Sequence, residues 1–360
     1  MNLRILSLDE SAAEWDAALE RLPSRLRDVY FTSAYHLLWQ RHGDGEACGA
    51  VFEHSAGLVL YPFLRRRLED VPWLGERFAG LVDIASAYGY GGPLVHPAGD
   101  AADELRTAFR KAFADWRGDA GVVSEFVRFH PLLHTEEGFG TLLGAKPANE
   151  TVVCKVGIDP EMQLRAMTAA TRRNVRKAQG AGLTFAVETS DAAYADFGHL
   201  YRETMERRRA AAFYLFDDRH FSDFRALLGD AQALLAVRHE GRMVAGALFM
   251  RSADFAHYHL GGSDADALEL RPNNLLFFEA MNWAGAAGLT ELHLGGGYRA
   301  GGQDELLRFK SGFSAGRSRL FLGRAIHREA DNRDAEQARR AAGPLGDAGF
   351  FPTYRAPLPG

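Results

Sequence analysis

The sequence predicts an α+β protein with two tandem domains, and two observations lead to this prediction. The chain has 360 residues, which is more than a single hydrophobic core usually supports. One order of elements, a hairpin followed by a strand, a helix and another strand, can be recognised twice along the chain. We therefore expect the same supersecondary unit at the centre of each domain.

The second copy of this order has the clearer pattern. Asn273 or Asn274 can cap the start of its helix after Pro272, and Gly288 stands where a left-handed residue can end it. Apolar residues recur between these limits at helical spacing. The hairpin, which turns at Glu240-Gly241, the third strand, the helix and the last strand are predicted at residues 233–239, 242–252, 255–263, 273–288 and 289–297.

The first copy follows the same order in the N-terminal half of the chain. Its hairpin turns at residues 55–57, where small residues separate two alternating strands. The strand after the hairpin ends in glycines, and the helix after that strand is amphipathic. The hairpin, strand, helix and last strand are predicted at residues 50–67, 86–95, 101–116 and 122–131.

A polar turn at residues 146–149 is the predicted domain boundary. We assign residues 1–148 to the first domain, residues 149–327 to the second domain and residues 328–360 to a C-terminal tail. The remaining elements of the second domain are a strand, two helices and a final strand, at residues 151–158, 160–182, 191–211 and 317–327.

The composition is that of a soluble globular protein. Hydrophobic residues make up 47% of the chain and charged residues 25%, and no apolar run is long enough to cross a membrane. Acidic residues interrupt positions 1–15, where a signal peptide needs an apolar core, so we expect a cytoplasmic protein. Cys48 and Cys154 have no paired spacing, which excludes a cysteine-ligated zinc site, and no metal is expected.

The net charge of −5 gives no global reason to expect a nucleic acid partner. Basic residues are nevertheless concentrated in three short clusters, which could equally be solvated faces of helices and ends of strands. The clusters are Arg65-Arg66-Arg67, Arg172-Arg173 with Arg176-Lys177, and Arg207-Arg208-Arg209.

A hairpin, a third strand, an irregular loop, a helix and another strand form the order of the acyltransferase fold called GNAT. In GNAT enzymes that use acetyl-CoA, the loop before the helix is glycine-rich, and its backbone N–H groups hold the pyrophosphate. Here Pro272 removes one donor, while Asn274 and Leu276 place side chains where the backbone must approach a phosphate closely. The sequence therefore predicts a GNAT-like fold without this cradle, and Arg271 and Asn274 are the candidate donor-binding residues.

Seven segments in this order resemble the Fem family (FemABX), transferases that use aminoacyl-tRNA to add amino acids to peptidoglycan precursors. The segments span nearly the whole chain, at residues 87–95, 127–131, 171–183, 204–208, 258–263, 292–297 and 306–313. The resemblance implies two GNAT-like domains of the compact type, because residues 182–233 leave room for only a single helix and not for a long helical arm. It also implies an aminoacyl-tRNA donor, an amine acceptor and cell-wall biogenesis as the process.

An aminoacyl ester is already activated, so the enzyme needs no covalent intermediate and no cofactor. It must position the amine, remove a proton from it and stabilise the oxyanion. The resemblance places Lys310, preceded by Phe309, at the family's Phe-Lys pair, where a cation faces the terminal ribose and the developing charge. An exposed lysine beside a packing phenylalanine is the alternative.

The resemblance also assigns acceptor-binding residues. Arg208, or Arg207 if the register differs by one, matches the arginine that binds the acceptor's phosphates, and arginine grips phosphate bidentately. A solvated helix end is the alternative. Tyr258 matches a tyrosine that faces the site, although a strand tyrosine that only packs fits equally well.

Two positions depart from the family's pattern. His130 stands where compact members have Asp, and imidazole is the better general base at neutral pH, although His130 could instead only bond a turn. Arg41 stands near the family's lysine for the nucleotide phosphates and could replace it. If Arg41 does not replace it, the acceptor need not be a UDP-linked sugar peptide.

Three functions are therefore open. The first is an aminoacyl-tRNA-dependent transferase that forms an amide on a cell-wall precursor or a peptide-like metabolite. The second is an N-acyltransferase that uses an acyl-CoA, because the fold is shared. The third is a tRNA- or peptide-binding module without catalysis.

Overall fold

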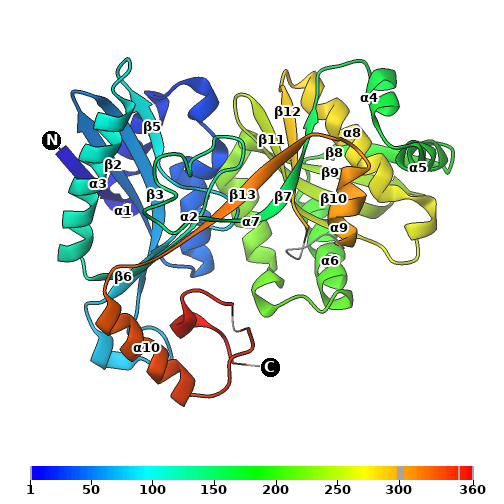
Figure 1. Ribbon diagram of the computed structural model, residues 1–360. Helices are drawn as coiled ribbons and strands as arrows, with labels where there is room; N and C mark the ends of the chain where they lie inside the picture. The colour runs from blue at the N-terminus through cyan, green and yellow to red at the C-terminus, as the bar shows by residue number, and fades with distance from the viewer. Residues whose placement is uncertain (1, 298–303, 348, 359–360) are drawn as a thin grey trace. The chain divides into compact units, whose positions relative to one another are not determined.

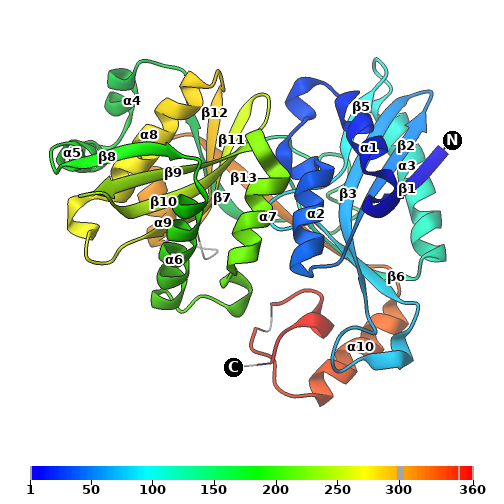
Figure 2. The same ribbon diagram turned by 180° about the vertical axis from the view of Figure 1, so that it is seen from behind.

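The computed structural model describes residues 2–297, 304–347 and 349–358. The chain forms two compact units, one of Met1–Ala148 with Leu320–Gly360 and the other of Asn149–Arg319 (Figure 1, Figure 2). Residues 320–327, expected in the second domain, and the tail, expected apart from both, group with the first unit. The reason is that residues 322–326 pair with a strand of that unit, and Tyr354 of the tail donates to Asp83 there.

The first unit is a mixed sheet with helices on both faces. Its strands are β1 (Asn2–Ser7), β2 (Glu46–His54), β3 (Gly57–Arg67), β4 (Val82–Ala85), β5 (Leu94–Pro97), β6 (Val122–Arg128) and the C-terminal part of β13 (Arg317–Ile326). Its helices are α1 (Leu8–Glu20), α2 (Ser33–His42), α3 (Ala102–Asp119) and α10 (Glu329–Ala341). The strand order is β1-β2-β3-β4-β6-β13, with β5 paired to β3, and only β4 and β6 run parallel.

The alternation of side chains along β2 explains how helices cover both faces of this sheet. Ala50 and Phe52 belong to the core under α3, where the ring centroids of Phe52 and Phe109 are 5.8 Å apart. Gly49 faces the opposite side, and a Cβ atom there would lie 2.8 Å from the ring of Trp15 in α1. The missing side chain of Gly49 thus lets α1 pack directly on the sheet.

The second unit has the same layered construction. Its strands are β7 (Lys146–Lys155), β8 (Leu183–Glu188), β9 (Gln232–His239), β10 (Arg242–Arg251), β11 (Phe255–Ser263) and β12 (Glu291–Gly295). Its helices are α4 (Pro160–Ala166), α5 (Ala169–Gln179), α6 (Asp191–Arg207), α7 (Asp218–Leu228), α8 (Pro272–Ala286) and α9 (Glu305–Ser311). The strand order is β7-β12-β11-β10-β9-β8, and only β11 and β12 run parallel.

The core of the second unit lies between its sheet and helices α5 and α8. Val175 of α5 and Leu276 of α8 join one cluster with the inward side chains of β9 and β10. Helix α6 packs on the other face, where a Cβ atom at Gly246 of β10 would lie 2.9 Å from Phe197. Among the described residues, no helix is long and apolar enough to span a membrane.

The two units repeat one order of strands and exchange their last strands. β2, β3, β4 and β6 correspond to β9, β10, β11 and β12, and the helix between the parallel strands is α3 in one unit and α8 in the other. β7 follows β6 along the chain but pairs with β12, whereas β13 follows β12 but pairs with β6. The order expected from the sequence is present, but the third strand of the first copy was expected at residues 86–95 and is instead β4 at Val82–Ala85, while residues 94–97 form β5 beside β3. The final antiparallel strand of each unit comes from the other half of the sequence.

Three expectations about helices in the second unit were wrong. Helix α8 begins at Pro272 with Arg271 as its N-cap, so proline occupies the first helical position, which it tolerates well. The helix expected over residues 160–182 is two helices, because Thr168 leaves the helical conformation to cap α5. Residues 182–233 hold strand β8 and helices α6 and α7 rather than a single helix.

Candidate functional site

The candidate catalytic residues of the second unit meet where β11 and β12 part. The two parallel strands pair only between residues 255–257 and 291–293. After these residues β11 continues beside β10, while β12 continues beside β7. Tyr258 is the first residue of β11 beyond the paired part, and Gly296 follows the end of β12. Because the two strands no longer pair with each other at their C-terminal ends, side chains from other elements can lie between these ends.

Lys310 occupies the position between these two strand ends. Its Nζ atom donates a hydrogen bond of 2.8 Å to the carbonyl oxygen of Gly296 and lies 5.0 Å from the ring centroid of Tyr258. A cation over an aromatic face is attracted by the ring quadrupole, so the contact orients the ammonium group. Only 4% of the residue is exposed, which overturns the alternative of an ordinary surface lysine.

The burial of Lys310 determines its protonation. Removal from water lowers the pKa of Lys310 to about 7, although the negative charge of Asp304 acts in the opposite direction. Both the ammonium and the free amine are therefore populated near neutral pH. A group in this state can donate a proton or accept one, which suits a reaction that moves a proton away from an amine.

Asp304 determines where the short helix α9 begins, and the sequence analysis missed it. Its Oδ1 atom accepts the backbone N–H of Leu307 at 2.9 Å, the arrangement of an N-cap. Its carboxyl carbon would lie 2.3 Å from a Cβ atom at Gly297, so glycine is required there. The cap fixes the helix that carries Phe309 and Lys310. An aspartate directly before Glu305-Leu306-Leu307 was the sequence signal for such a cap.

Phe309 and Tyr258 belong to an aromatic cluster beneath Lys310. The ring of Phe309 lies 5.4 Å from Phe277 and 5.3 Å from Phe313, both edge to face. Tyr258 lies 5.0 Å from the same Phe277. These contacts give Phe309 a packing role that holds α9 against α8. Of the predicted catalytic pair, Lys310 alone presents a titratable atom.

Residues 165–311, which include the Lys310 site, match a protein family described as an acetyltransferase (GNAT) domain. The protein has a GNAT-like fold. This match supports an acyltransferase, and it includes the α8 N-terminus that GNAT enzymes use for their donor. Curated proteins yield no match to the sequence.

Solved structures share the GNAT-like fold over most of the chain. A crystal structure of FemX has a TM-score of 0.69 at 14% identity and covers 92% of this chain and 99% of that chain. A conserved protein of unknown function from Bacteroides thetaiotaomicron VPI-5482 has a TM-score of 0.58 at 12% identity, with coverages of 89% and 99%. The C-terminal domain of a proposed lysylphosphatidylglycerol synthetase from Agrobacterium fabrum has a TM-score of 0.51 at 16% identity, with coverages of 94% and 100%. At these identities the likeness concerns the fold.

At the N-terminus of α8, where a GNAT enzyme would hold a pyrophosphate, the backbone N–H groups of Arg271, Asn274 and Leu275 are engaged within the chain. The N–H of Arg271 donates to Leu268, the N–H of Asn274 donates back to Arg271, and Pro272 has none. The Asn274 side chain is 6% exposed, and Leu276 lies in the core. Arg271 adopts a left-handed conformation with φ of 63°, which lets the chain turn into the helix. These amides are therefore not arranged as a phosphate cradle.

The two arginines predicted to bind an acceptor have different surroundings. Arg207 donates a hydrogen bond of 2.9 Å from Nη2 to the carbonyl oxygen of Ser263, which ties the end of α6 to the end of β11. Arg208 is the C-cap of α6 and is exposed. Both residues are exposed, and the two differ in that the bond to Ser263 gives Arg207 a structural contact.

In the first unit, the structure places His130 in a hydrogen-bonded turn. Its Nδ1 atom accepts the backbone N–H groups of Leu132 at 3.3 Å and Leu133 at 3.2 Å, and its Nε2 atom lies 3.7 Å from Asp28. The residue is completely buried. A ring nitrogen that accepts from two amides is already used, so these contacts favour the turn-bonding role over the general base. Arg41, in contrast, is exposed in the last turn of α2.

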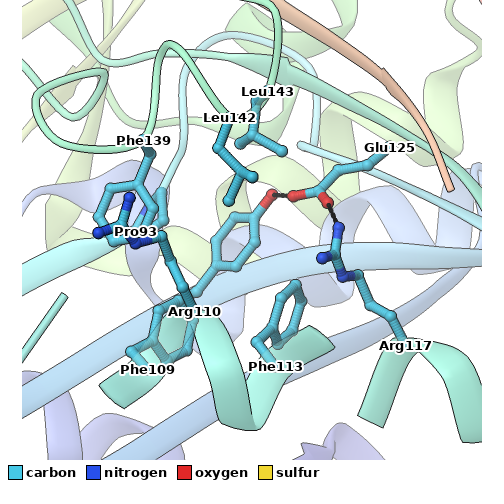
Figure 3. Close-up of a pocket in the computed structure, with 10 residues that line it drawn as sticks. Pro93, Phe109, Arg110, Phe113, Arg117, Glu125, Phe139, Leu142 and Leu143 are labelled. Carbon is cyan, nitrogen blue, oxygen red and sulfur yellow. Dashed lines mark hydrogen bonds and ion pairs between the residues drawn. The ribbon is translucent and has the colours of Figure 1, made fainter. Parts of the chain in front are cut away.

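A charged cluster that the sequence analysis missed lies in the first unit, beside a small pocket (Figure 3). Glu125 of β6 accepts hydrogen bonds from the Tyr61 hydroxyl at 2.8 Å and from Arg117 Nη1 at 3.2 Å, and His327 lies 2.9 Å from it. Burial alone would raise the pKa of Glu125, but His327, Arg117 and Tyr61 together lower it. A carboxylate within an apolar strand was the sequence signal, because such a charge needs partners.

Proposed function

We propose that the protein is an aminoacyltransferase that forms an amide between an amino acid carried by aminoacyl-tRNA and an amine acceptor. The acceptor would be a peptidoglycan precursor or a peptide-like metabolite. The observation that carries this proposal is the N-terminus of α8, whose engaged amides and Pro272 argue against a pyrophosphate-bearing donor. Aminoacyl-tRNA offers an activated acyl group without such a pyrophosphate, and it is made in the cytoplasm, where we place the reaction.

The proposed reaction requires no covalent enzyme intermediate. The acceptor amine attacks the ester carbonyl, a C–N bond forms, the bond to the ribose oxygen breaks, and the amine loses a proton that the ribose oxygen finally receives. Lys310 fits both proton steps, because burial lowers its pKa to about 7. As an ammonium group it would also stabilise the oxyanion of the tetrahedral intermediate.

The acceptor would be held by cationic side chains. Exposed Arg208, at the end of α6, is the candidate for phosphate groups on it, and exposed Arg41 of α2 is the alternative candidate. Tyr258 would face the acceptor or the aminoacyl group, because it already contacts Lys310. An aminoacyl product agrees with the name of one structural relative, the C-terminal domain of a proposed lysylphosphatidylglycerol synthetase.

A transfer assay tests this function. The protein is incubated with a labelled aminoacyl-tRNA pool and separate candidate amines, among them a UDP-linked precursor peptide and short free peptides. We expect an amide product that disappears when the donor is first treated with RNase. Product formed only from acetyl-CoA or another acyl-CoA would refute the proposal.

The acyl-CoA alternative has its own binding test. Because the amides at the start of α8 are engaged, CoA should not raise the melting temperature at any concentration. A thermal shift that grows with the logarithm of CoA concentration would show that the cradle forms after all. Aminoacyl-tRNA serves as the positive control for ligand binding in the same assay.

A further inference from the structure

Helix α5 of the second unit presents a concentrated basic face. Its apolar side, formed by Val175 and Ala178, is buried, and the helix contains no Asp or Glu. Residues three and four apart on a helix share a face, so four cations line up along its outer side. They are Arg172, Arg173, Arg176 and Lys177.

Most of this charge is not neutralised within the protein. Arg173 and Arg176 are exposed, and within the described part of the chain neither has an acidic partner. Lys177 has a single ion pair, with Glu269 at 3.9 Å, and both side chains are more than half exposed, so the pair is weak. Arg172 donates to two backbone carbonyls at the end of α4. These cations repel one another, and few of the described acidic side chains lie near enough to offset the repulsion. Such a surface is typical of one that binds an anionic partner.

The N-terminal end of α5 touches the helix that carries Lys310. Thr168, the N-cap of α5, donates its backbone N–H to the carbonyl oxygen of Gly312 at 3.0 Å, and Gly312 is the C-cap of α9. A Cβ atom at Gly312 would lie 2.1 Å from the Thr171 hydroxyl, so the two helices touch at this glycine. A polyanion lying along α5 would therefore lead toward the end of α9.

We propose that the basic face of α5 binds the phosphodiester backbone of the RNA whose aminoacylated end reaches the Lys310 site. The proposal rests on the proposed function and names the docking surface for its donor. Regularly spaced cations along one helix complement regularly spaced phosphates, whereas a free nucleotide offers only a few. The exposed face of α5 has no large apolar side chain, which a helix lying in a membrane interface would need.

The test measures RNA binding rather than catalysis. Fluorescently labelled, deacylated bulk tRNA is titrated with the full chain at several salt concentrations, and binding is followed by anisotropy. The test variant is the double substitution Arg173→Gln/Arg176→Gln. The matched control is Arg333→Gln/Arg340→Gln on α10, which removes the same charge from two exposed helical arginines. Circular dichroism verifies that each variant is folded.

We expect the α5 variant to bind tRNA about tenfold more weakly near 0.1 M salt. Its plot of log affinity against log salt should also be shallower by roughly 1.5 to 2, as expected for two lost phosphate contacts. The control should match the wild type in both respects. Equal loss in the α5 variant and the control, or no loss in either, would overturn the proposal.

A vesicle arm distinguishes a membrane from RNA. Ile158 and Met162 are exposed near the start of α4, so vesicles of anionic phosphatidylglycerol are tested with the same variants. If the α5 variant loses vesicle binding and keeps tRNA binding, the proposal fails. If aminoacyl transfer proceeds and tRNA binding is insensitive to α5, the docking surface is wrong while the function stands. If the wild type neither binds tRNA nor transfers from it, the function fails as well.

Discussion

Glu125 and Lys310 are two buried charges, one in each of the repeated units, and they are held in opposite ways. Glu125 lies on β6 and Lys310 follows β12, the strand that corresponds to β6. Glu125 has three polar partners, and their effect on its pKa exceeds that of burial. Lys310 has a backbone carbonyl and an aromatic ring, and burial dominates its pKa.

The difference separates a structural charge from a reactive one. A buried ion that its neighbours keep in one protonation state holds the fold together but cannot exchange protons at neutral pH. A buried ion whose pKa is brought near neutral pH by desolvation lowers the stability of the fold. The same group can take up or release a proton at neutral pH. The same repeat thus contains an inert charged cluster in one unit and a candidate acid–base group in the other.

Replacing Lys310 should give the largest effect on activity. We expect Lys310→Met to lower the rate of acyl transfer by at least about a hundredfold, because a group that faces developing charge is lost. The free energy of unfolding should not fall, since the substitution keeps the apolar stem and removes a desolvated amine. Single-turnover rates and urea unfolding measure the two quantities. Lys155→Met, at an exposed lysine of β7, is the control; parallel loss of rate and stability in Lys310→Met would make Lys310 structural.

Replacing Glu125 should have the opposite outcome. We expect Glu125→Gln to lower the free energy of unfolding by about 3 kcal/mol, because Arg117 would remain buried without its counter-charge. The transfer rate of the folded variant should stay that of the wild type. Urea unfolding compares it with Glu137→Gln, at an exposed glutamate. A stability equal to that of this control would show that the cluster is not needed for folding.

The lowered pKa of Lys310 should make the free energy of unfolding rise with pH. The pKa of Lys310 is lowered from 10.5 to about 7, so below pH 7 the charged form is buried and the fold is destabilised in full. Between about pH 7 and 10.5 the unfolded chain binds the extra proton, and stability rises with pH. The advantage of Lys310→Met over the wild type, on the order of a few kcal/mol at pH 6, should therefore vanish by about pH 10.5. Urea midpoints of both proteins across this range measure it, and a constant difference would contradict a lowered pKa.

The smallest effect is expected at His130. Because its Nδ1 atom accepts two turn amides, His130→Ala should lower the free energy of unfolding by about 1 to 3 kcal/mol. His130→Asn, which keeps an acceptor, should lose less. Single-turnover pH–rate profiles of the wild type and His130→Asn should superimpose. An acidic limb that only the wild type shows would instead identify His130 as the general base.

The sequence was sufficient for the repeated order of elements, since hairpins and amphipathic helices are local signals. It misplaced the third strand of the first copy, expected at residues 86–95, because the glycines there belong to the connection between β4 and β5. It could not reveal the exchange of the last strands. From the sequence alone, β7 would be expected to pair with β6 and β13 with β12, because each follows that strand along the chain, but the structure pairs them the other way round. Pairing between segments far apart in the chain leaves no local pattern.

The site was predictable in its residue types and less so in its environments. Lys310 and Tyr258 were identified, and the structure brings them into contact. The burial of Lys310 could not be foreseen, because it depends on the parting of β11 and β12 and on the cap at Asp304. For His130 the residue type was misleading. Imidazole is suited to base catalysis, but in the structure its Nδ1 atom accepts hydrogen bonds from two backbone amides of a turn.

The exchange of β7 and β13 has a consequence for synthesis on the ribosome. Chains are made from the N-terminus, and domains usually fold in that order. Here the first unit lacks the strand that pairs with β6 until residues 322–326 emerge, whereas β7, the strand that pairs with β12, is already made before β12. The half of the protein that is translated first is thus the half that is finished last. Until then, the exposed backbone of β6 is open to wrong partners.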